Sequence, residues 1–194
     1  MSSWGASDAD EAKPKWLTTA QKKQVYATTA GWVEEAGNAS SGNNNTSAAP
    51  EVLVCVKNLH TKLGAATITS CEFVTTAWDA SAGGTLQVRV RWNEAVDVVS
   101  AGSGFKIVVN RTPDGGSAAS HTLRYASGTG TNELTFSLAI AGGVAAADTV
   151  FSMVAQSVVK AGVTSLKDAG TSTDSALAIT SAQCTAAGTI TATA

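Results

Sequence analysis

The side chains that could do chemistry are few and lie far apart in the chain. Its two histidines and three cysteines are His60, His121, Cys55, Cys71 and Cys184. None of them stands in a CxxC or HExxH spacing, so no zinc site or disulfide framework is indicated, and we expect the cysteines to be reduced core residues. The glycine-rich stretch 128–132 lacks the Lys-Ser/Thr ending of a phosphate-binding loop and is typical of a hairpin turn. We therefore expect no enzyme activity, no cofactor and no bound metal.

Acidic residues near the expected strand ends offer the one alternative to this expectation. They are Asp79, Glu94, Asp97, Asp114, Asp168 and Asp174. Carboxylate and carbonyl oxygens gathered at one end of a β-sandwich could bind Ca²⁺. No DxDxDG loop accompanies these acids, so the capping of turns is the favoured interpretation and calcium the alternative.

Composition and charge exclude two classes of partner. The chain has 194 residues, of which 14% are charged and 44% hydrophobic, and its formal net charge is −2. One main domain is expected at this length, and the lack of a basic field removes the main argument for nucleic-acid binding. No run approaches the ~18 apolar residues of a membrane span, and the first twenty residues hold no apolar export signal. We expect synthesis in the cytoplasm, with no nucleic acid or membrane as partner.

The first part of the chain differs in composition from the rest. Residues 1–36 carry nine charged side chains and three of the five tryptophans, but show no β-alternation. A tract of small polar residues at 38–49 is typical of a linker. We divide the chain into an N-terminal arm and polar linker (1–50), a connecting strand and turn (51–65) and one folded domain (66–194). The sequence does not decide whether the connecting strand belongs to the folded domain.

The folded domain has the pattern of an antiparallel sandwich. The clearest strand places Leu86, Val88, Val90 and Trp92 on one face and Gln87, Arg89 and Arg91 on the other. Further short runs rich in Val, Ile, Thr and Phe alternate with Gly, Asp and Asn turns. They are 67–74, 105–110, 122–126, 133–140, 150–159 and 176–184, with a short piece near Thr189. We predict an all-β fold, an Ig-like antiparallel β-sandwich preceded by an extended N-terminal arm.

Two sequence patterns in this domain resemble the bacterial Ig-like modules that recur in large surface proteins. The first is VRWNEAVDV at 90–98, followed by an apolar strand at Phe105, and the second is YASGTGTNELTF at 125–136. With its flanking strands the resemblance spans roughly residues 66–193. It implies a fold and says little about function.

The N-terminal part resembles the opening of small virion structural proteins of tailed phages, especially marine cyanobacterial myoviruses. The matching segments are SWGASD (3–8), KPKWL (13–17), KQVYAT (23–28), GWV (31–33) and EVLV (51–54). The resemblance implies a non-enzymatic virion protein synthesised in the host cytoplasm, most simply a capsid decoration or cement protein. A neck or tail component of the virion and a surface adhesion module are the alternatives.

A capsid-bound protein needs anchors, and aromatic side chains bury the largest area at interfaces. The arm supplies these anchors, with two lysines beside them as rim charges that guide the approach. The expected interface residues are Trp4, Lys13, Lys15, Trp16, Leu17, Tyr26 and Trp32. The expected partner is the major capsid protein or another virion structural protein, with self-association on the particle as a further possibility.

Overall fold

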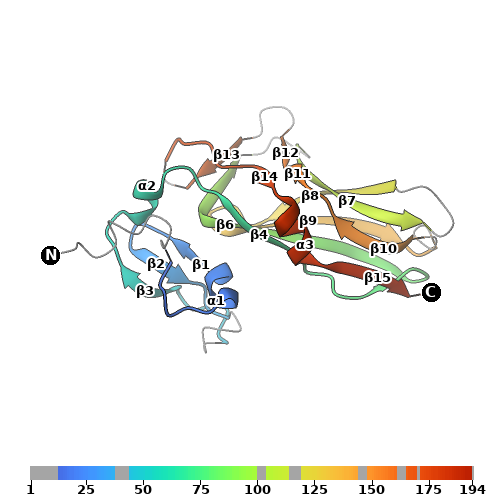
Figure 1. Ribbon diagram of the computed structural model, residues 1–194, viewed down its shortest axis with the longest axis horizontal. Coiled ribbons are helices and arrows are strands. Elements are labelled where there is room, and N and C mark those ends of the chain that lie inside the picture. Colours follow the sequence, from blue (N-terminus) through green and yellow to red (C-terminus); the bar gives the residue numbers. More distant parts are fainter. Residues whose placement is uncertain are drawn as a thin grey trace.

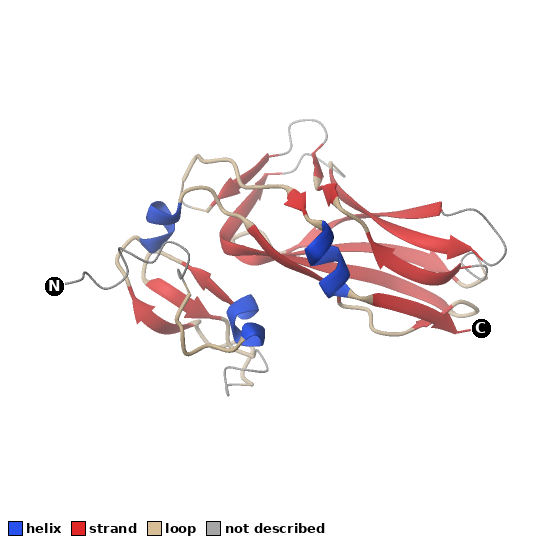
Figure 2. Cartoon of the chain, viewed as in Figure 1, coloured by secondary structure: helices blue, strands red, loops and turns tan. Residues whose placement is uncertain are grey.

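The computed structural model describes residues 13–37, 44–99, 104–113, 119–143, 148–160, 165–169 and 171–193. Strands dominate this part of the chain, and the predicted all-β class is confirmed. Figures 1 and 2 show two parts, a small N-terminal lobe and an elongated body. We use "lobe" for the described residues of 13–63 and "body" for those of 66–193.

The strands of the body form one long hydrogen-bonded path, β6-β9-β8-β7-β10-β15-β5. These strands are β5 (Trp78–Asp79), β6 (Gly83–Val99), β7 (Phe105–Pro113), β8 (Ala119–Ser127), β9 (Thr131–Ala141), β10 (Asp148–Met153) and β15 (Thr189–Thr193). Two further strands, β4 (Ile68–Phe73) and β13 (Ser165–Asp168), pair with β6, and β12 (Val159–Lys160) pairs with β7. A short pair, β11 (Gln156–Ser157) with β14 (Ala178–Ile179), and helix α3 (Ser181–Ala187) complete the body.

The core of the body follows the alternation seen in the sequence. Leu86, Val88, Val90 and Trp92 are all 0% exposed, as predicted for the inner face of β6. The inner residues of β7, β8, β9 and β10 join them in one cluster. The indole of Trp92 donates to the carbonyl of Ala176 at 3.0 Å, which satisfies its polar atom inside this core.

Most pairs of neighbouring strands are antiparallel, but β15 pairs with β5 in parallel and β1 pairs with β6 in parallel. The antiparallel expectation, which concerns residues 66–194, is therefore wrong for the β15–β5 pair. The finer assignment to the Ig-like sandwiches stays a prediction.

The expectation of an extended arm is wrong for the described residues of the N-terminal part. They fold into helix α1 (Thr19–Gln24), strands β1 (Val25–Ala27), β2 (Gly31–Glu34) and β3 (Glu51–Cys55), and helix α2 (Leu59–Leu63). The three strands form an antiparallel sheet in the order β3-β2-β1. The strands β1 and β2 are buried at every position, on both faces. For this reason they show no alternation in the sequence.

A small core of its own holds the lobe together. Leu17, Val25, Ala27, Trp32 and Leu59 pack on one another, with partly buried residues of β3 and α2 around them. Residues 51–65, expected as a connecting strand and turn, thus supply the outer strand and a helix of this lobe. Leu17 and Trp32 of the N-terminal segment find their packing partners here.

Candidate functional site

Three of the seven predicted interface residues are internal to the lobe. Leu17, Tyr26 and Trp32 are 8%, 5% and 4% exposed, so the prediction that they are free to contact a partner is wrong. The hydroxyl of Tyr26 donates to Glu35, and burial together with this bond raises the pKa of Tyr26. Trp4 lies outside the described residues.

Lys13 also departs from its predicted role as an exposed rim charge. Its ammonium group donates to the carbonyl of Lys22. Burial, and then the positive charges of Arg91 and Lys22, lower the pKa of Lys13 to about 8. This lysine lies between the lobe and the body instead of facing a partner.

Trp16 is the predicted anchor that remains at the surface, with 65% of its area exposed. It lies in a turn, residues 14–17, which we call the Trp16 turn. Pro14 and Leu17, at the two ends of the turn, are buried, and the Leu17 amide donates to the Pro14 carbonyl at 3.3 Å. Lys15 is exposed beside Trp16. The turn is thus fixed at both ends and presents a lysine and a tryptophan outward.

A second feature lies where the lobe meets the body, in a β-bulge of β6. In the β6–β9 ladder, Arg91 pairs with Glu133 and Val96 with Thr131, so residues 92–95 face the single residue Asn132. At this irregular point β1 joins the body, through the pair of Ala27 with Glu94. Bulges of this kind release backbone from regular pairing and redirect side chains.

Three polar side chains point into the interior at this bulge, and we call Glu94, Asn132 and Asp168 the junction cluster. They are 0%, 1% and 1% exposed. One oxygen of Glu94 accepts from the Asn93 amide at 3.2 Å. Within the described residues, Glu94 Oε2, Asp168 Oδ1 and both amide atoms of Asn132 have no hydrogen-bond partner. Buried polar atoms are rarely left in this state.

Electrostatics in the junction cluster disfavour two negative charges. Burial, and then the neighbouring Asp168 carboxylate, raise the pKa of Glu94 to about 8, while the Asn93 amide opposes the shift. Burial also raises the pKa of Asp168, against the opposing effects of Thr171 and His60. Neither carboxylate forms an ion pair with a lysine or arginine of the described part of the chain.

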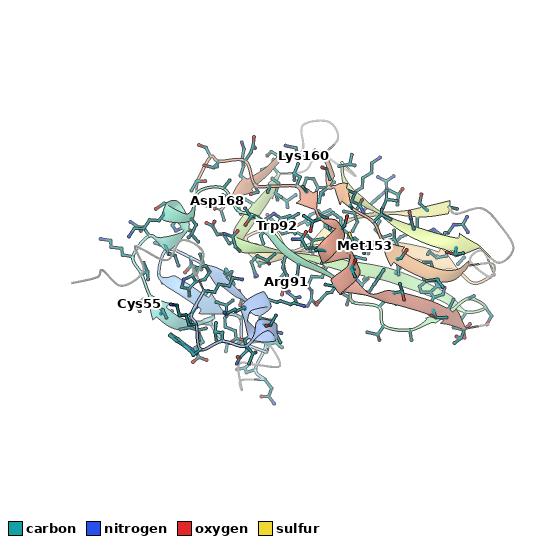
Figure 3. All side chains as sticks on the ribbon, in the orientation of Figure 1. Cys55, Arg91, Trp92, Met153, Lys160 and Asp168 are labelled. Carbon is teal, nitrogen blue, oxygen red and sulfur yellow. The ribbon has the colours of Figure 1, made fainter. Side chains whose placement is uncertain are left out.

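A pocket of about 260 Å³ lies beside this cluster, between the lobe and the body. Its wall includes Thr28, Thr29 and His60 from the lobe and Asp168 and Ala169 from the body. The Nδ1 atom of His60 is buried without a partner among the described residues. Figure 3 labels Asp168, Trp92 and Arg91 at the end of the body that faces the lobe.

The acids that the sequence places near strand ends have different roles. The prediction of turn capping holds for Asp79, whose carboxylate accepts from the amides of Ser81 and Ala82 at 2.9 and 3.1 Å. It is wrong for Glu94, which lies on a buried, inward-facing position of β6. Asp168 is buried too, but it ends β13 and interacts with Thr171 three residues further on, as expected for an acid at a turn. Asp174 forms an exposed ion pair with Lys167 at 2.7 Å.

The cysteines are free thiols in the structure. Cys71 and Cys184 are buried as expected, whereas Cys55 is exposed on the outer strand of the lobe, so its expected place in a core is wrong. Cys184 also lines a second pocket of about 400 Å³ beside β10.

The described ranges contain no group of three or more His, Cys, Asp or Glu side chains that could hold a metal ion by themselves. They also contain no helix that is long and apolar enough to cross a membrane. No protein-family profile, curated protein or solved structure matches the chain.

Proposed function

We propose that this chain is a non-enzymatic structural protein of a tailed-phage virion, a capsid decoration protein that docks on the head through its Trp16 turn. The proposal combines the N-terminal resemblance with one observation of the fold. That observation is the exposure of Trp16, at 65%, on a turn whose two ends are buried.

An exposed tryptophan on a fixed turn suits an interface anchor for two reasons. Tryptophan buries a large area when it enters a partner's pocket, and it is enriched among the residues that dominate binding energy. The buried ends of the turn hold its backbone in place, so little conformational entropy is lost when a partner binds. Leu17 and Trp32, predicted as direct anchors, support this proposal as the core on which the turn rests.

Binding to purified heads that lack the protein tests the proposal. Full-length chain with Trp16→Ala should co-sediment with heads about 30-fold to several hundred-fold more weakly than the parent, which corresponds to ~2 to 4 kcal/mol. Val159→Ala, which alters an exposed apolar side chain of the body (40% exposed), is the matched control and should bind like the parent.

Equal binding of the Trp16→Ala variant would show that another surface docks, and no binding by any version would overturn the capsid role. Binding of the parent to phage tails or to host cells in place of heads would favour the neck, tail or adhesion alternatives.

A further inference from the structure

We propose that the junction cluster binds one Ca²⁺ ion, with Glu94 and Asp168 as its charged ligands and the amide oxygen of Asn132 as a neutral one. This inference does not depend on the virion role. It replaces the sequence-based expectation of a protein without metal, and it makes the attachment of the lobe to the body sensitive to Ca²⁺.

Strand register brings the three side chains together. The strand β6 lies between β9 and β13, and it carries Glu94 at the bulge. On one side, Asn132 of β9 faces the bulge; on the other side, Asp168 of β13 stands opposite Val96. Glu94 and Val96 are two residues apart on a strand, so their side chains share one face. All three polar groups therefore enter the same end of the core.

Among the described residues, the cluster has no lysine or arginine partner. Two carboxylates and an amide are buried here with four unpartnered polar atoms, three of which are oxygens, Glu94 Oε2, Asp168 Oδ1 and Asn132 Oδ1. Burying carboxylates without a counter-charge is costly, because the low-dielectric interior replaces water. A bound divalent cation would supply two positive charges and would be coordinated by these three oxygens at once.

The chemistry of the groups favours Ca²⁺ over other divalent ions. Zn²⁺ prefers three or four His, Cys or carboxylate ligands, and the described residues bring no such group together. Mg²⁺ requires a nearly ideal octahedron of ligands, which an irregular bulge does not impose. Ca²⁺ accepts six to eight oxygens from carboxylates, amides, backbone carbonyls and water in flexible geometry.

The neighbouring pocket supplies a route and a source of water ligands. Its volume of about 260 Å³ is large enough for several water molecules, and Asp168 forms part of its wall. Its lining also includes Ala27, Thr28 and Thr29 of the lobe. Ala27 ends β1 and pairs with Glu94, and the two threonines follow it directly. An ion at this point would touch the only ladder contact between β1 and β6, so its binding energy would stabilise the joint between the two parts.

Thermal unfolding of the full chain gives the first test. Protein treated with a chelator and then dialysed should melt several degrees higher with Ca²⁺ than without, because an ion bound only by the folded state raises its stability. Mg²⁺ at the same concentration should produce a much smaller shift. Equilibrium dialysis should find one Ca²⁺ per chain.

Terbium luminescence localises the ion. Tb³⁺ replaces Ca²⁺ in oxygen sites and emits when a nearby indole is excited, and Trp92 lies two residues before Glu94 on the same interior face. Excitation of tryptophan should therefore produce Tb³⁺ emission that added Ca²⁺ removes. Glu94→Gln and Asp168→Asn should each weaken Ca²⁺ binding by about 10-fold or more, since each removes a charged ligand.

Glu51→Gln is the matched control, because it removes one carboxylate from an exposed position on β3. It should keep the Ca²⁺ shift and the Tb³⁺ emission. Glu94→Gln should fold without metal, because it preserves the side-chain shape and removes a buried charge. If this variant fails to fold, Asp168→Asn and equilibrium dialysis of the parent protein test whether the junction cluster binds Ca²⁺.

The proposal is overturned if Ca²⁺ leaves the melting temperature of the parent unchanged and Tb³⁺ emission is absent. It is equally overturned if both signals persist undiminished in Glu94→Gln and Asp168→Asn, because the ion would then bind elsewhere.

Discussion

Arg91 on β6 stands directly opposite Glu133 on β9, and its guanidinium bonds that carboxylate. The same guanidinium reaches Glu72 on β4 at 2.8 Å, so one side chain links three neighbouring strands. Arg91 is only 4% exposed, although it belongs to the outer face of β6, because the lobe covers it on the side of Lys13. The position where the sequence places a solvent-facing arginine is thus an interior contact between lobe and body.

We expect Arg91→Met to lower the free energy of unfolding by about 2 kcal/mol. Removing one partner of a buried ion pair leaves the others uncompensated, but both acids keep some access to water, which reduces the loss. Arg89→Met is the control: Arg89 contacts the same two acids from a side chain that is 32% exposed, and surface pairs contribute about 0 to 1 kcal/mol. Urea denaturation followed by far-UV circular dichroism measures both, and equal losses would contradict the bridging role of Arg91.

The two tryptophans of the lobe should separate stability from binding. Trp32→Ala removes a residue that is 4% exposed from the lobe core, and we expect a loss of about 3 to 5 kcal/mol together with faster proteolysis of the lobe. Trp16→Ala changes an exposed side chain, so the stability should stay within about 0.5 kcal/mol of the parent. Chemical denaturation and limited trypsin digestion test this pair, and a large loss in Trp16→Ala would show that the Trp16 turn is part of the core.

The body could be predicted from the sequence because its strands bury only one face. Leu86, Val88, Val90 and Trp92 alternate with polar residues because only their face of β6 is buried in the core. The lobe could not be predicted in the same way, since β1 and β2 are buried on both faces and β3 follows only after a long polar tract. For this reason the sequence pattern presents Trp32 as an anchor for a partner although it packs inside the lobe, whereas Trp16 is exposed.

The junction cluster has a weak signal in the sequence. After Trp92 the inward positions of β6 continue with Glu94, a charged residue where the pattern calls for an apolar one. That departure marks the position. Its meaning depends on Asn132 and Asp168, which come from strands far along the chain and approach only through the register of the fold.

The cysteines should differ in reactivity toward a thiol reagent such as DTNB. In native protein we expect one thiol to react quickly, Cys55, because it is exposed. Burial raises the pKa of Cys71 to about 12 and also raises that of Cys184, so few thiolates form there and reaction should be slow. Unfolding under non-reducing conditions should release all three thiols. A native count of two or three fast thiols would contradict the burial of Cys71 and Cys184.

The stability of the protein should rise between about pH 8 and 10.5 through Lys13. Its pKa is lowered from 10.5 to about 8 in the folded state, so in this range the unfolded chain binds the proton and the folded chain does not. Stability increases with pH wherever the unfolded state binds more protons, here by at most about 1.4 kcal/mol per pH unit. Below pH 8 the buried ammonium lowers the stability of the folded protein, and Lys13→Met should therefore be more stable than the parent at pH 7. That advantage should shrink as the pH approaches 10.5, because only the parent gains stability over this range.

Urea denaturation of both proteins at each pH measures this difference, and the comparison cancels the titration of other groups. Lys57→Met removes an exposed lysine of the same lobe and controls for the change in net charge. A constant difference between Lys13→Met and the parent from pH 7 to 10.5 would show that the ammonium of Lys13 is solvated in the folded protein, as the sequence alone had suggested.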